Sequence, residues 1–290
     1  REILDIAALQ YENVLNDSLS KVTNKNIIQR STISDAYLSP GVFRYDYQGD
    51  ISIEKNELLI FVGASDQNKP SNTNSKLTSS ETGRILANGA AGSYATFQYN
   101  GWIKGDDYIA LMSRGQEGVI GVVNGVLAPT GNDFAPWGGG INFDENTDWH
   151  FSKNISDKTS FSGYDFYSVA LHEIGHVLGV GNSPSWSKNL IYQDDNIGYQ
   201  FIGNNSIAIN NGTPISLDRN AEHFADGLSQ SPLMSGSILE GQRKNLTQLD
   251  YAALRDVGWE VSPVPEPDTW AMITIGLGIV ALGARNKARK

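Results

Sequence analysis

Two histidines four residues apart carry the clearest chemical signal in this sequence. His172 and His176 occur in "HEIGHVLGVGN" (residues 172–182), and Glu173 follows the first of them. Four residues make about one turn of an α-helix, so both imidazoles leave the same helix face. The spacing H-E-x-x-H is typical of two metal ligands and a general base. It predicts a catalytic zinc site in which Glu173 is the base.

A catalytic zinc ion needs three protein ligands and one open position for water, so a third ligand must come from elsewhere. The sequence has four histidines and no cysteine, which excludes cysteine-ligated zinc and a thiol nucleophile. Asn182 stands where many enzymes with this motif place a third histidine, but a neutral amide is a weaker zinc ligand than imidazole. The other histidines are His150, which we expect in a strand, and His223, with Glu222 beside it. The residues alone leave these alternatives open.

The stretch "YDFYSVALHEIGHVLG" (residues 164–179) predicts the helix that carries the motif. Asp165 is a suitable N-cap. Gly179 can adopt a positive φ, which would end the helix and turn the chain beneath the metal. An apolar stripe is expected to pack on a sheet: Tyr167, Leu171, Ile174 and Leu178.

A methionine after the last histidine adds a second motif. Met234 lies in "SPLMSG", eleven residues after His223. A methionine turn that follows the last ligand is a hallmark of the metzincins, and this segment resembles it. "INFDENTDW" followed by "FYSVALHEIGHVLG" resembles the matrixin branch of that group, from which Asn182 departs.

Leishmanolysin-type metzincins offer a parallel for the missing histidine. They keep H-E-x-x-H-x-x-G and place a long insertion before a distant third histidine and the methionine turn. The order here is similar, with 43 residues between Gly179 and His223. The resemblance implies that zinc is held by His172, His176 and His223, with Met234 in the turn below.

The resemblance also implies the fold and the reaction. The fold is α+β and zincin-like, with a twisted mixed sheet packed on an active-site helix and a C-terminal helical part after the Met-turn. The reaction is peptide-bond hydrolysis by a zinc-activated water whose pKa falls to about 7. Glu173 takes the proton of that water and returns it to the leaving amine. By family analogy, an extended substrate would lie along an edge strand at residues 138–143.

Two other functions stay open at this stage. One is a catalytically inactive zinc-binding surface protein that serves matrix adhesion. The other is a gluzincin-type peptidase with Glu222 as third ligand. Calcium is a further candidate cofactor, because "APWGGGINFDEN" resembles the calcium loops of matrixins, with Asp133 and Asp144 as donors, although the ligand pattern is incomplete.

The remaining chain up to residue 262 is read as one metallopeptidase domain. An amphipathic first helix is predicted from apolar residues at helical spacing: Ile3, Ala7, Tyr11, Val14, Leu15 and Leu19. Short apolar runs predict strands of one sheet: "ISI", "ELLIFVGA", "YATFQY", "DYIALM", "GVIGVVNGVLA" and "GGINF". The polar stretch 65–80 is read as a surface loop. "NLTQLDYAALRDVGWEV" predicts a terminal helix with a Thr247–Asp250 capping box and a stop at Gly258.

Residues 263–290 form a different kind of segment. A proline-rich spacer precedes an apolar run from about 270 to 284 and a basic end. The triad Pro265-Glu266-Pro267, with the two parts that follow, resembles the PEP-CTERM sorting signal of Gram-negative bacteria. The resemblance implies export to the cell surface or outside, recognition by an exosortase, and transient membrane anchoring by this segment. About fifteen apolar residues are short for a membrane span, which usually takes roughly 20.

The charge of the chain restricts its partners. The net charge is −10 over 290 residues, which argues against binding nucleic acid through its phosphates. We expect a protein or peptide substrate and a monomer. No N-terminal signal peptide is visible before "REILDIAALQ", so we take it as removed or left out.

Overall fold

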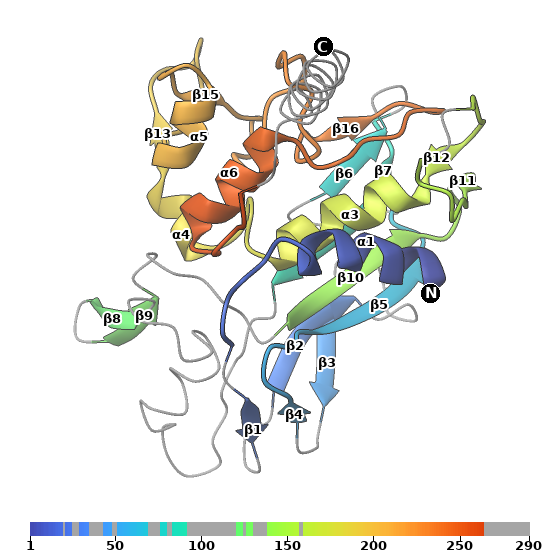
Figure 1. Ribbon diagram of the computed structural model, residues 1–290, viewed down its shortest axis with the longest axis horizontal. Coiled ribbons are helices and arrows are strands. Elements are labelled where there is room, and N and C mark those ends of the chain that lie inside the picture. Colours follow the sequence, from blue (N-terminus) through green and yellow to red (C-terminus); the bar gives the residue numbers. More distant parts are fainter. Residues whose placement is uncertain are drawn as a thin grey trace, which may run out of the picture.

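The computed structural model describes residues 1–19, 21–24, 29–34, 43–47, 51–68, 76–79, 83–91, 120–123, 126–129, 138–156 and 159–263. A five-stranded mixed sheet runs through the body of these residues (Figure 1). Its order is β16-β6-β7-β10-β5, and the bounds are Leu59–Ser65 for β5, Lys76–Ser79 for β6, Ile85–Ala91 for β7, Gly138–Asp144 for β10 and Ser237–Ile238 for β16. β10 is parallel to β5 and antiparallel to β7, and β16 is parallel to β6.

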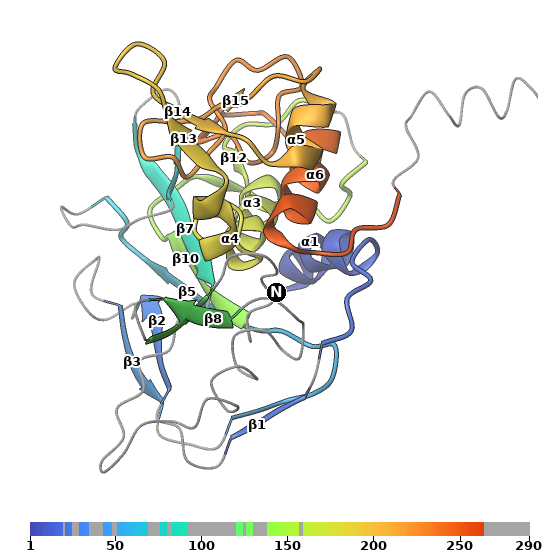
Figure 2. The same ribbon diagram turned by 90° about the vertical axis from the view of Figure 1, so that its left-hand side faces the viewer.

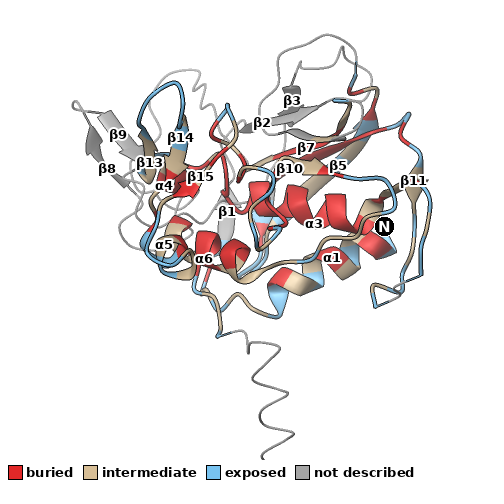
Figure 3. Cartoon of the chain, turned by 90° about the horizontal axis from the view of Figure 1, so that it is seen from above, coloured by how far each residue is buried: buried red, intermediate tan, exposed pale blue. Residues whose placement is uncertain are grey.

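The helix α3 (Phe166–Val177) lies between this sheet and α1 (Glu2–Glu12), as the view from above shows (Figure 3). Asp165 caps its first turn by accepting a hydrogen bond from the backbone N–H of Ser168 at 3.2 Å. Gly179 follows the helix with φ +100°. The predicted N-cap and the predicted positive φ of the glycine after the helix are therefore both confirmed. The helix is buried from Tyr167 to Val177, so none of its faces is exposed to solvent.

The 43 residues after Gly179 fold into a compact excursion at one end of α3 (Figure 2). It contains α4 (Pro184–Lys188), α5 (Asn204–Ile209) and an antiparallel sheet of β13 (Leu190–Tyr192), β14 (Tyr199–Phe201) and β15 (Ile215–Ser216). Its centre is aromatic: the Trp186 ring stacks on Phe201 at 4.0 Å and meets Phe224 edge-on at 5.7 Å. These three side chains are fully buried, and they bring the chain back to α3 at residue 223.

The terminal helix α6 (Gln248–Val257) has the predicted capping box, and it ends at Gly258 with φ +121°. Trp259 is buried and donates from Nε1 to the carbonyl of Leu178 at 2.7 Å, which fixes the chain beside α3. The chain then pairs with the segment after α1, where the N–H of Ser262 donates to the carbonyl of Val14 at 2.8 Å.

Several strand expectations hold and others are wrong. The runs at 57–64 and 139–143 lie side by side as β5 and β10. However, β4 (Ile51–Ile53) pairs with β1 (Val22–Asn24), and β8 (Ile120–Val123) pairs with β9 (Val126–Pro129), so these runs do not join the same sheet. A further pair is formed by β2 (Gln29–Ser34) and β3 (Phe43–Tyr47). The two short strands β11 (Trp149–His150) and β12 (Tyr164–Asp165) pair just before α3.

Other predictions made from the apolar and polar runs are untested or only partly correct. The runs at 94–99 and 107–112 lie outside the described residues. The stretch 65–80 is not only a loop, because β6 lies within it. The first helix ends at Glu12, so Leu15 and Leu19 follow it in an extended segment instead of continuing its stripe.

The proposed substrate edge at residues 138–143 is also wrong. β10 is an inner strand, with β5 on one side and β7 on the other, so both of its edges are already paired.

The strand β7 was not predicted from the sequence. Its sequence "ILANGAA" is rich in small residues and lacks the apolar and polar alternation that marks a strand.

Candidate metal centre

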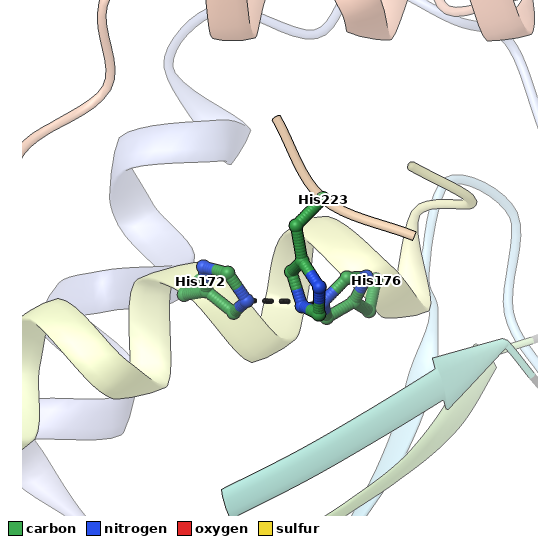
Figure 4. Close-up of side chains that lie close together, drawn as sticks. All are labelled: His172, His176 and His223. Carbon is green, nitrogen blue, oxygen red and sulfur yellow. Dashed lines mark hydrogen bonds between the residues drawn. The ribbon is translucent and has the colours of Figure 1, made fainter. Parts of the chain in front are cut away.

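Three histidine side chains meet at one point above α3 (Figure 4). His172 and His176 stand on consecutive turns of the helix, and His223 reaches them from the returning chain. Nε2 of His176 lies 3.0 Å from Nε2 of His172 and 3.1 Å from Nε2 of His223. Nitrogens held tetrahedrally at zinc bond lengths of about 2.0–2.1 Å would be about 3.3 Å apart, so the spacing fits one ion. In the described part of the chain, these three form the one group of histidine and acidic residues able to hold a metal.

The opposite ring nitrogens settle which atoms face the centre. Nδ1 of His172 lies 2.9 Å from the carbonyl oxygen of Leu233, and Nδ1 of His176 lies 2.7 Å from that of Val180. Nδ1 of His223 lies 2.8 Å from Oδ2 of Asp218. Carbonyl and carboxylate oxygens only accept, so each Nδ1 must carry the proton.

Neutral imidazoles with Nδ1 protonated leave their Nε2 lone pairs pointing at one another. Burial, together with the neighbouring rings, lowers the pKa of His172 well below its ordinary value. Burial first, and the electrostatic effect of the neighbouring His223 ring second, lower the pKa of His176 to about 3. Three lone pairs gathered at this distance repel one another unless a cation lies among them. The donor set therefore fits a metal ion that prefers nitrogen ligands, as zinc does.

Glu173 follows the first histidine of this cluster on α3, and its carboxylate has an unusual setting. Both of its oxygens are buried, and neither has a hydrogen-bond partner among the residues that the structure describes. Burial raises the pKa of Glu173 well above its ordinary value. Gly89 of β7 lies against it, since a Cβ built on Gly89 would be 2.8 Å from Oε2 of Glu173. A buried carboxylate with a raised pKa is suited to taking up a proton.

Met234 packs under the helix that carries His172 and His176. Its side chain is buried, and its sulfur would lie 2.5 Å from a Cβ built on Gly175, which directly precedes His176. Asp250 fixes the turn by accepting from the backbone N–H groups of Leu233 and Met234, each at 2.9 Å. Because the carbonyl of Leu233 orients His172, α6 and the turn together hold one imidazole in place.

Neither His150 nor Glu222 is a member of the three-histidine group. His150 is in β11 and stacks on Phe161 at 4.0 Å, as expected of a strand residue. Glu222 is not a member of the histidine group, although it directly precedes His223. The side-chain amide of Asn182 is buried, and within the described ranges neither its nitrogen nor its oxygen has a hydrogen-bond partner.

Asp218 is a residue of the site that sequence reasoning missed. Burial alone would raise its pKa, but the hydrogen bonds from His223 and from the backbone outweigh burial and lower the pKa. The only signal in the sequence was an acidic residue five positions before a histidine, which is too common to identify a contact.

Comparison with known proteins agrees with the geometry over part of the chain. Residues 94–200 match the family model of the matrixins, and residues 263–290 match that of the PEP-CTERM protein-sorting motif. The similarity to matrixins thus covers residues 94–200. The match includes His172, Glu173 and His176 and stops before His223, so the third imidazole stands on the structure alone. Matrixin sequences imply zinc, and the PEP-CTERM motif indicates export and surface sorting in Gram-negative bacteria.

Two plant proteins resemble part of this chain. Metalloendoproteinase 1 of Glycine max is 43% identical over 53 residues, which are 18% of this chain and 17% of that protein. Metalloendoproteinase 4-MMP of Arabidopsis thaliana is 31% identical over 99 residues, which are 32% of this chain and 28% of that protein. The chain thus spans less than a third of the length of these curated relatives. No solved structure gives a significant match.

The predicted calcium site and the predicted membrane segment are only partly covered by the described residues. Asp144 is fully buried and already accepts from Arg84 at 2.5 Å, from Thr147 at 2.7 Å and from the N–H of Gln67 at 2.9 Å. Asp133 lies outside the described residues. Within those ranges, no helix has the length and apolar character needed to cross a membrane, and the apolar run at 270–284 lies outside them.

Proposed function

We propose that this chain is an exported zinc-dependent endopeptidase, with His172, His176 and His223 as the zinc ligands and Glu173 as the general base. The observation that carries the proposal is the convergence of three deprotonated Nε2 atoms, each backed by an acceptor at Nδ1. The buried carboxylate of Glu173, one residue after His172, adds the second part of the chemistry. The matrixin match and the two plant metalloendoproteinases support the reaction class.

The protein's own groups divide the work. Zinc held at this point would supply Lewis acidity, which polarises a carbonyl and lowers the pKa of water to about 7. The three imidazoles remain neutral, so the charge of the ion is not offset. The carboxylate of Glu173 accepts a proton from the attacking water, holds it because burial raises its pKa, and transfers it to the leaving amine nitrogen. Met234 supports the helix from below, in the manner expected of a Met-turn.

An extended peptide would bind along β7 and not along β10. Among the described residues, β6 pairs with β7 only from Ile85 to Asn88, whereas Gly89–Ala91 pairs with β10 alone. Gly89 packs on Glu173 through one face of the sheet, so a strand-like substrate along the side of β7 that β6 does not pair in the described ranges would lie near the base. We also propose that residues 1–262 form the peptidase domain and act as a monomer. The tail at 263–290 is then the exosortase signal and the transient anchor.

A Glu173→Gln variant tests the proposal. The amide keeps the shape of the side chain but cannot take the proton, so cleavage of casein should fall by about 10²–10⁴. Zinc, measured by metal analysis, should stay near one ion per chain in both proteins. A parent protein that holds zinc but leaves casein intact would instead identify an inactive zinc-binding surface protein. Zinc that survives loss of His223 but not of Glu222 would point to the gluzincin arrangement.

A further inference from the structure

The third imidazole is supported differently from the other two. His172 and His176 stand on a buried helix, and backbone carbonyls orient both rings. His223 lies in a loop, and its Nδ1 donates to the carboxylate of Asp218 at 2.8 Å. Among the three histidines, His223 alone has a side-chain partner at Nδ1, and this partner is the carboxylate of Asp218.

The carboxylate of Asp218 also closes the loop that carries His223. Its Oδ1 accepts from the backbone N–H of Glu222 at 3.0 Å and more weakly from that of His223 at 3.4 Å. The main chain closes in the same place, because the N–H of Asp218 donates to the carbonyl of His223 at 2.9 Å. One side chain therefore fixes both the backbone and the ring of the ligand residue.

This loop is held in a conformation that it would not adopt freely. Ala221 has φ +61°, a left-handed value that is unfavourable for a residue with a Cβ. Its carbonyl accepts from Nε1 of the buried Trp186 at 2.7 Å, which anchors the loop on the aromatic centre of the excursion. The hydrogen bond from Trp186 and the hydrogen bonds of Asp218 therefore hold the same loop.

We propose that Asp218 is the positioning residue that presents His223 to the metal and lets this chain form a three-histidine site without a histidine at position 182. The inference rests on the proposed zinc site. By accepting a hydrogen bond from the Nδ1–H group of His223, Asp218 fixes the tautomer whose Nε2 lone pair faces the other two rings. A carboxylate partner also makes that imidazole a stronger donor than a carbonyl partner would. Asp218 itself does not touch substrate or metal.

The test measures zinc affinity in the full chain, by competition with a chelator, for Asp218→Ala, Asp218→Asn and His223→Ala. Loss of a carboxylate that supports a ligand typically weakens metal binding by about 10–100-fold. We expect that loss for Asp218→Ala and a smaller one for Asp218→Asn, whose amide can accept the ring proton but cannot also accept both backbone N–H groups. His223→Ala should bind weakest. Cobalt-loaded Asp218→Ala should show a shifted visible spectrum, since the donor strength of one ligand changes.

Asp256→Ala is the matched control. Asp256 also accepts backbone and side-chain hydrogen bonds in the excursion, from the N–H and the amide of Asn205 and from the N–H of Ser206, each at 2.8 Å, and it lies away from the three rings. This variant should lower the melting temperature and leave zinc affinity and the cobalt spectrum unchanged.

The outcomes separate the two hypotheses. A parent chain that binds no zinc overturns the proposed function and this inference with it. A parent that binds zinc, with Asp218→Ala and Asp218→Asn within about threefold of it, overturns this inference alone. Equal loss of affinity in Asp256→Ala would also overturn it, because the effect would then be general loosening. If Asp218→Ala does not fold, Asp218→Asn decides by the same criterion.

Discussion

Gly89 and Glu173 lie in direct contact although they come from different elements of the fold. A Cβ on Gly89 would be 2.7 Å from the backbone oxygen of Glu173 and 2.8 Å from its Oε2. Real Cβ atoms do not come this close to backbone atoms, so only glycine lets β7 approach α3 here. The close approach covers the carboxylate, and in the described ranges Gly89–Ala91 pairs with β10 but not with β6.

Gly89→Ala should therefore damage catalysis more than metal binding. The added methyl group must push β7 away from α3 or turn the carboxylate of Glu173. A displacement of about 1 Å can lower the rate by about 10². We expect kcat/KM for a peptide substrate to fall by at least tenfold, with zinc content unchanged. Activity within twofold of the parent would show that the contact does not set the geometry of the base.

Two alanine substitutions decide which residue completes the cluster. His223→Ala should lose bound zinc and peptide cleavage together, because the charge and the open position of a catalytic zinc depend on three protein ligands. Asn182→Ala should keep both, since its amide makes no hydrogen bond to another described residue. The reverse result would assign the site to Asn182. Two silent substitutions would direct attention to Glu222 or His150.

The parts of the site that the sequence predicts are those encoded locally. Helix α3 follows from a periodic stretch with an acidic N-cap and a terminating glycine, and α6 follows from Thr247 and Asp250 three residues apart. His172 and His176 share a face because helical spacing requires it. Only the order of motifs along the chain suggested His223, and the structure brings it to the other two rings.

The parts that the sequence does not predict depend on tertiary contacts. β7 is recognisable as a strand only from its pairing with β10 and β6, since its small residues have weak strand propensity. Small residues are nevertheless required at Gly89, where the strand meets α3. Asp218 reaches His223 because aromatic packing around Trp186 folds the loop, and no local pattern encodes that packing.

Calcium should add little to the stability of this protein. The buried Asp144 already has a cationic partner, because Arg84 donates to it at 2.5 Å. Removing one partner of a buried ion pair typically costs about 3–5 kcal/mol, and the one-third exposure of Arg84 reduces this to roughly 2 kcal/mol. Arg84→Met should thus be clearly less stable in urea unfolding, whereas added calcium should not shift the midpoint of the parent. A calcium-dependent rise of several degrees in the parent's melting temperature would contradict this interpretation.

A chain that ends at Ser262 should fold as the full chain does. The last contacts of the described body are made by this residue: its N–H donates to the carbonyl of Val14 at 2.8 Å, and its Oγ accepts from Asn16 at 2.6 Å. The tail of residues 263–290 would then be dispensable for stability. We expect a soluble monomer in size-exclusion chromatography, with the melting temperature of the full chain. Aggregation of this shortened chain would show that the apolar run belongs to the core and that the sorting interpretation fails.

A chain that ends at Gly258 is the control for that experiment. It lacks Trp259, whose buried indole donates to the carbonyl of Leu178 directly after α3. Loss of a buried tryptophan typically costs about 3–5 kcal/mol, a large share of the stability of one domain. This shorter chain should therefore unfold at a much lower urea concentration than the chain that ends at Ser262. Equal stability of the two would place the end of the folded body before Trp259, and not at Ser262.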